Sequence, residues 1–87
     1  MKLLICSVLD KAAECFGSPV FTVSKGTAHR SFVDEVNRQS QDNVMFAHPE
    51  HFDLYCLGEF ENSTAEFNVF PQPQLIVRGS EVRHVSE

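Results

Sequence analysis

The sequence predicts an α+β domain, in which one main helix packs on a small, mostly antiparallel sheet of three or four strands. Two observations predict this class: apolar residues recur with helical spacing in one segment only, and alternating apolar strand patterns lie on both sides of it. The length of 87 residues allows one domain, and an apolar fraction of 43% is typical of a folded chain. We expect the domain to span residues 1–77, followed by a polar, mobile tail over residues 78–87.

The helix is predicted over residues 24–37. Ala28, Phe32, Val33 and Val36 follow one another at spacings of one, three and four, which places them along one side of a helix. Ser24 precedes them and can accept a hydrogen bond from an amide of the first turn, so it is the expected N-cap. Polar turn-forming residues at 37–40 indicate where the helix ends.

The strands are predicted on both sides of this helix. Residues 2–9 are apolar on both alternating faces, which is the pattern of a central strand. Residues 53–60 and 65–70 alternate around the turn at 61–64 and predict a hairpin. Residues 10–19 read as a loop, and residues 20–23 as a short extended segment leading into the helix.

Prolines mark two further boundaries. Pro49 begins a predicted single helical turn over residues 48–52. Pro71 and Pro73 have no amide to donate to a neighbouring strand, so we expect them to end the hairpin, with residues 74–77 returning as a brief edge strand.

The charge balance bears on the class of partner. Seven Lys and Arg oppose twelve Asp and Glu, which gives a formal net charge of −5. Proteins that coat nucleic acid draw affinity from many Lys and Arg contacts to phosphates, and the cations here are scattered along the chain. The composition therefore favours protein partners.

Cysteine content and hydropathy bear on location. Three cysteines without metal-type spacing predict reduced thiols and no disulfide framework. The apolar run at residues 2–9 is too short for a membrane span and lacks the features of a signal peptide. We expect a soluble, intracellular protein that makes no membrane contact.

One helix covers one face of a sheet, so the other face needs a cover. Residues 44–52 are one candidate, and a second copy of the chain is the other. We favour a homo-oligomer, because exposed contiguous apolar patches usually mark interfaces. The predicted interface residues are Leu4, Val8, Tyr55 and Leu57.

Two groups of residues are candidates for nucleic-acid contact. Lys25, Gly26 and Arg30 stand at the start of the predicted helix, where free amides and two cations favour a phosphate. Aromatic side chains could stack on bases, and the candidates are Tyr55, Phe60, Phe67 and Phe70. A solvated surface turn is the favoured explanation of the first group, and a phenylalanine-rich core is the favoured explanation of the second.

Metal and catalytic patterns are weak. His48 and His51 are spaced to reach one ion, with Cys56 as a third donor, but no fourth ligand stands at a telling distance. A nucleophilic set of Cys15, His29 and Asp34 has no supporting motif. We therefore expect no metal, no cofactor and no enzymatic activity.

Two runs of residues together carry a resemblance to a known family. The first spans residues 25–37 and includes Lys25, Gly26 and Arg30, and the second spans residues 48–60 with its His-Pro-Glu start. With the apolar strand at the beginning of the chain, the sequence resembles the small nonstructural protein of microviruses, especially the gokushovirus branch of single-stranded DNA phages. The resemblance covers roughly residues 2–70.

The resemblance implies a non-enzymatic accessory protein in the cytoplasm of the infected bacterium, supporting the switch to single-stranded DNA synthesis or packaging. Its expected partners are itself and phage or host replication proteins. Direct binding of single-stranded DNA through the helix start and exposed aromatics is the alternative, with Lys25, Gly26 and Arg30 as the phosphate contacts. A third possibility is a host-directed interaction module. The acidic charge and the segment at residues 71–84 depart from the family pattern.

Overall fold

The first strand of the chain lies in the middle of the sheet. The computed structural model describes residues 1–84, and in it β1 (Lys2–Asp10) pairs antiparallel with β4 (Phe52–Glu61) from end to end. The opposite edge of β1 pairs with β2 (Cys15–Phe16) and β3 (Val20–Thr22), which follow β1 directly in sequence. This confirms the prediction of a central N-terminal strand, whose apolar residues on both faces are now explained.

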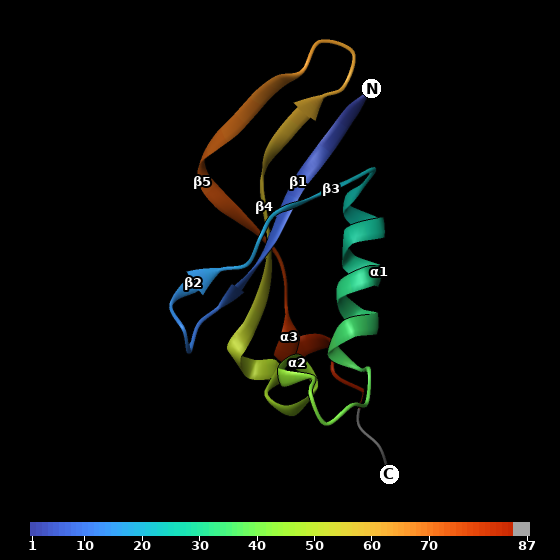
Figure 1. Ribbon diagram of the computed structural model, residues 1–87, viewed down its shortest axis with the longest axis vertical. Helices are drawn as coiled ribbons and strands as arrows, with labels where there is room; N and C mark the ends of the chain where they lie inside the picture. Colours follow the sequence, from blue (N-terminus) through green and yellow to red (C-terminus); the bar gives the residue numbers. More distant parts are fainter. Residues whose placement is uncertain (85–87) are drawn as a thin grey trace.

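The remaining elements surround this centre (Figure 1). β4 continues into β5 (Glu66–Arg78) through a tight turn, so the sheet has the order β2-β1-β4-β5, with β3 beside β1. The helical elements are α1 (Lys25–Val36), α2 (Val44–Ala47), the 3-10 turn η1 (Pro49–His51) and α3 (Gly79–Val82). The predicted hairpin and the predicted helical turn after residue 48 are both confirmed.

α1 forms where the sequence predicts it. The Ser24 hydroxyl accepts a hydrogen bond from the Thr27 amide at 3.1 Å, which confirms Ser24 as the N-cap. Ala28, Phe32 and Val36 are buried against the sheet. At the other end of the helix, the Asn37 side-chain amide donates to the carbonyls of Val33 and Val82, and so ties α1 to α3.

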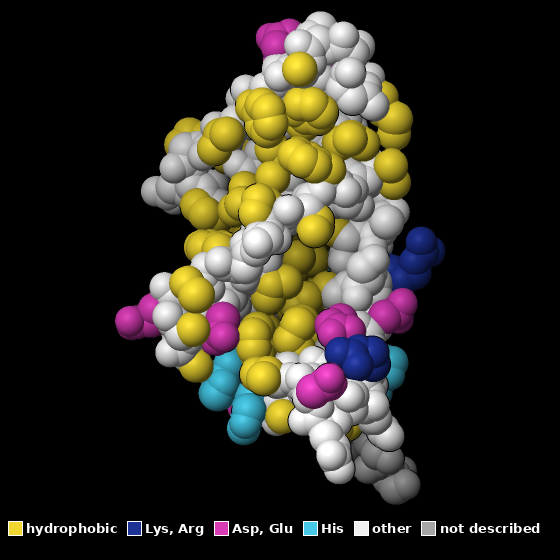
Figure 2. All heavy atoms as spheres, viewed as in Figure 1, with side chains coloured by type: hydrophobic (Ala, Val, Ile, Leu, Met, Phe, Trp, Pro, Cys, Tyr) yellow, Lys and Arg dark blue, Asp and Glu magenta, His cyan; other side chains and the backbone are white. Residues whose placement is uncertain are grey.

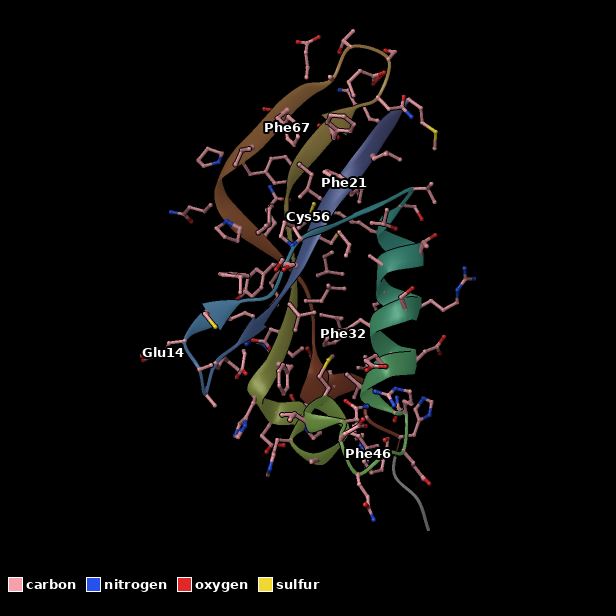
Figure 3. All side chains as sticks on the ribbon, in the orientation of Figure 1. Glu14, Phe21, Phe32, Phe46, Cys56 and Phe67 are labelled. Atoms are coloured by element: carbon pink, nitrogen blue, oxygen red, sulfur yellow. The ribbon has the colours of Figure 1, made fainter. Side chains whose placement is uncertain are left out.

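The core lies between α1 and one face of the sheet. Cys6 and Cys56 are paired across β1 and β4, and neither is exposed to solvent. Figure 3 shows Phe32 of α1 pointing toward this face of the sheet. Burial, together with the neighbouring Cys56 thiol, raises the pKa of Cys6 to about 11, so the thiol stays protonated. These thiols therefore act as small apolar core groups.

The predicted architecture of one main helix on a small sheet is wrong. Strands hold 44% of the described residues and helices 27%, and the antiparallel sheet curls into a half-barrel with small helices around it. Pro71 and Pro73 were expected to end a strand, but β5 runs through both. They fit because the register jumps from the Cys56–Gln74 pair to the Gly58–Val69 pair, which leaves residues 70–73 bulged out of the ladder.

The chain after β5 packs against the helical end of the molecule. Gly79 begins α3 and is buried so closely against Pro49 and Phe52 that a side chain would meet both of their carbonyl oxygens. The backbone amide of His84 donates to the Asn37 side-chain oxygen at 2.6 Å. Of the predicted mobile tail, residues 85–87 lie outside the described residues. Within residues 1–84, no helix is long and apolar enough to cross a membrane.

The close approach of β4 and β5 at Gly58 gives a test of this register. An added Cβ at Gly58 would collide with the Asn68 carbonyl oxygen and lie 2.9 Å from the Val69 Cα, and both are backbone atoms. We expect Gly58→Ala to lower the free energy of unfolding by about 1–3 kcal/mol in urea denaturation. Gly26→Ala is the matched control, since the added methyl group would make only an ordinary van der Waals contact, 3.9 Å from the Ser24 hydroxyl oxygen, and would favour α1. Equal stability of the two variants would contradict the register.

Candidate interaction surface

The side of the sheet opposite α1 carries an uncovered set of aromatic side chains. On β1, Leu3, Ile5, Ser7 and Leu9 point away from the helix because strand residues alternate between faces. Their cross-strand neighbours continue this surface, which we call the aromatic face. It consists of Phe16, Phe21, Tyr55, Phe60, Phe67, Val69 and Leu75.

Three phenylalanines form the centre of the aromatic face. Phe60 lies between the other two, with ring centroids 5.2 Å from Phe21 and 4.8 Å from Phe67. Phe21 comes from β3, Phe60 from β4 and Phe67 from β5, so three strands bring the rings together. Phe67 is 61% exposed and Phe21 is 52% exposed, which are large fractions for side chains of this kind. Figure 2 shows apolar side chains gathered over this upper part of the molecule.

A second aromatic pair extends the surface toward β2. Phe16 and Tyr55 meet edge to face, with centroids 5.5 Å apart. Leu75 lies opposite Tyr55 on β5 and is also exposed. The aromatic face therefore draws its residues from β2, β3, β4 and β5, and five of its seven side chains are exposed.

The end of the aromatic face nearest β2 carries charge. Asp53 is buried, and its Oδ2 lies 3.3 Å from Lys11 Nζ and 3.5 Å from an Arg78 nitrogen. Its Oδ1 has no hydrogen-bond partner among the described residues. Because both cations share one carboxylate, they are held at the sheet end.

Other cations are also engaged. The Arg38 guanidinium donates two hydrogen bonds to the Glu35 carboxylate, at 2.7 and 2.9 Å. These bonds hold the pKa of that carboxyl below its usual range. Lys2 lies 4.0 Å from Glu59. The described surface thus has no continuous basic tract of the kind that coats nucleic acid.

The predicted nucleic-acid residues are divided between two places. Lys25, Gly26 and Arg30 are exposed at the start of α1, whose apolar side covers the opposite face of the sheet from Tyr55. Of the four predicted stacking residues, Phe60 and Phe67 join Tyr55 on the aromatic face. Phe70 packs against the core instead.

The predicted interface residues are divided in the same way. Leu4 and Val8 pack against the core under α1, and Tyr55 belongs to the aromatic face. Leu57 lies at the register shift of β4 and is half-buried. The structure therefore does not bring the four residues onto one surface. The sequence analysis did not identify Phe16 and Phe21. It predicted a loop over residues 10–19 and a short extended segment over residues 20–23, whereas β2 and β3 form the edge of the sheet there.

A groove lies beside α1 on the other side of β3. It has a volume of about 380 Å³ and is lined mainly by apolar residues, among them Cys6, Val20, Phe32 and Leu54. The nucleophilic set that was considered and rejected from the sequence is not assembled around it: Cys15 lies on β2, while His29 and Asp34 lie on α1, well apart in Figure 1.

The fold and this surface define a small antiparallel-sheet protein with one face of the sheet packed under helices and the other uncovered. A comparison with protein families matches residues 3–82 to the family described as Phage ORF5 protein. The chain belongs to this family and is a phage protein, made in the infected host. Neither a curated protein nor a solved structure gives a significant match. The narrower resemblance to microviruses stays a prediction.

Proposed function

We propose that this phage protein is a non-enzymatic accessory protein that supports the switch to single-stranded DNA synthesis, or packaging, through contacts with replication proteins in the bacterial cytoplasm. The proposal rests on one observation: the molecule has an uncovered aromatic face, while most of its cations are held in ion pairs with carboxylates. Open apolar surface without a basic tract favours protein partners over phosphate backbones. The family match supports the setting in a phage.

The first protein partner in this proposal is a second copy of the chain, bound through the aromatic face. The described residues bury only eight apolar side chains, so the monomer gains little stability from its own core. The face exposes on the order of 500 Å² of apolar surface, taking roughly 200 Å² for each phenylalanine. When fully covered, two such faces together bury about 1,000 Å², which is the threshold for a biological interface and the size of weak, transient ones.

Both edges of the sheet are poorly suited to pairing with another strand, which favours association through the aromatic face. Pro71 and Pro73 lie in β5, at one edge, and Pro19 separates β2 from β3 at the other. Proline has no amide to offer to an added strand, so it discourages edge-to-edge pairing of sheets. Face-to-face packing leaves α1, with Lys25 and Arg30, on the outside of the pair, where replication proteins can reach it.

Self-association can be tested with two exposed valines. Val69 belongs to the aromatic face and is 67% exposed, while Val44 on α2 is 55% exposed and lies outside it. We expect light scattering to give a dimer for the wild type and for Val44→Asp. Val69→Asp should weaken dimerisation at least about tenfold, because it buries an unpaired charge in the interface. A monomeric wild type, or equal dimerisation by both variants, would contradict the proposal.

The contact with the replication machinery needs its own experiment. Replication proteins of the same phage, purified separately, should bind the immobilised wild-type protein in the absence of DNA. Arg30→Glu on α1 should weaken this binding, whereas Lys2→Glu at the first residue of β1 should not. Capture of host proteins alone from a lysate, with no binding of phage replication proteins, would favour a host-directed module instead.

Direct binding of single-stranded DNA is a second candidate, favoured by the two aromatic groups aligned on one face. Bases can stack on exposed aromatic rings, at about 1–3 kcal/mol each. Under the leading proposal, we expect no change in fluorescence anisotropy of a labelled single-stranded oligonucleotide, even at low salt. Salt-sensitive binding that is lost on substituting Lys25 and Arg30, or Tyr55, by Ala would establish the second candidate and overturn this expectation.

A further inference from the structure

The turn between α2 and β4 brings three metal-binding side chains together. His48 ends α2, and Glu50 and His51 follow it in η1. Glu50 Oε1 lies 3.6 Å from His48 Nδ1 and 3.7 Å from His51 Nε2, and all three donor atoms lie within 4.8 Å of one another. Cys56, the third donor considered from the sequence, is buried in the core, so Glu50 takes that place.

These separations are close to those of a coordinated ion. Zinc binds imidazole nitrogen and carboxylate oxygen at about 2.0–2.2 Å, which places tetrahedral donors about 3.4 Å apart. The two distances to Glu50 are only slightly longer than this. The three side chains are 41–57% exposed, so small rotations are enough to close the site.

The backbone beneath the three side chains is fixed from several directions. The His48 amide donates to the Val44 carbonyl at 2.8 Å, and the His51 amide to the His48 carbonyl at 3.0 Å. The Lys11 amide donates to the His51 carbonyl at 2.8 Å, which joins the turn to the end of β1. Gly79 of α3 packs on the Pro49 carbonyl. A backbone held in this way lowers the ordering cost of binding.

The two imidazoles are stacked on each other. Their centroids are 5.1 Å apart, with an angle of 18° between the planes. Neutral imidazole is the form that binds a metal. Two nitrogens and one carboxylate suit zinc and its first-row neighbours, while magnesium and calcium prefer oxygen donors alone.

We propose that His48, Glu50 and His51 form a binding site for a divalent zinc-class ion, with water or a donor from a second molecule completing the coordination. This site is independent of the aromatic face and of the function proposed above. It replaces the expectation, made from the sequence, that the chain has no metal site.

Isothermal titration of the tag-free full chain with zinc chloride tests the proposal. We expect one zinc ion per chain for the wild type and for Cys15→Ser, which removes the exposed thiol as a competing ligand. His48→Ala and His51→Ala should each weaken binding at least about tenfold, since the loss of even an outer partner of a metal ligand costs that much. His29→Ala, at an exposed histidine on α1, is the matched control that should bind as the wild type does.

Two further measurements distinguish the loss of a zinc ligand from a loss of folding. Circular dichroism should show unchanged folding in every variant, because the substituted side chains are largely exposed. Binding should weaken as the pH falls from 7.5 to 5.5, because protonated imidazole cannot ligate zinc. Absence of zinc binding by the wild type, or undiminished binding by the His48→Ala/His51→Ala double variant, would overturn the proposal.

Discussion

Pairing between β1 and β4 is the interaction on which the rest of the structure depends. Every other strand joins the sheet through one of these two, and α1 packs where Cys6 and Cys56 lie opposite each other. With both of its edges paired and apolar residues on both faces, β1 has no side suited to open water. One of its faces is covered by α1, and the other lies beside the exposed Phe21 and the half-buried Phe60. The exposed aromatic face is therefore a direct consequence of a central strand that is apolar on both sides.

Much of the local structure could be predicted from short-range patterns. α1 and its cap followed from helical spacing and from Ser24, and the β4–β5 turn followed from turn-forming residues at 61–64. The proportion of sheet could not be predicted in this way. β2 and β3 are two and three residues long and depend on the edge of β1 for their hydrogen bonds, so they leave almost no pattern of their own. The length of β5 depends on a bulge opposite β4, which no rule about proline within a single segment anticipates.

The candidate surfaces were harder to predict, for the same physical reason. Tyr55, Phe60 and Phe67 were recognisable as strand aromatics, but their exposure depends on which face α1 covers. Leu4 and Tyr55 have similar patterns in the sequence and lie on opposite faces of the sheet. At the α2–β4 turn, the two histidines were visible from their spacing. The approach of Glu50 to both rings depends on the 3-10 geometry of η1.

The position of β1 at the beginning of the chain also has a consequence for synthesis on the ribosome. β2 and β3 can fold back on β1 as soon as they emerge, since they follow it within about a dozen residues. β4 ends at Glu61, so the other edge of β1 stays unpaired until most of the chain has been translated. Contacts between residues so far apart in sequence also slow folding. The nascent protein thus carries an apolar strand with one free edge for most of its synthesis, and the early β1–β3 pairing limits that exposure to a single side.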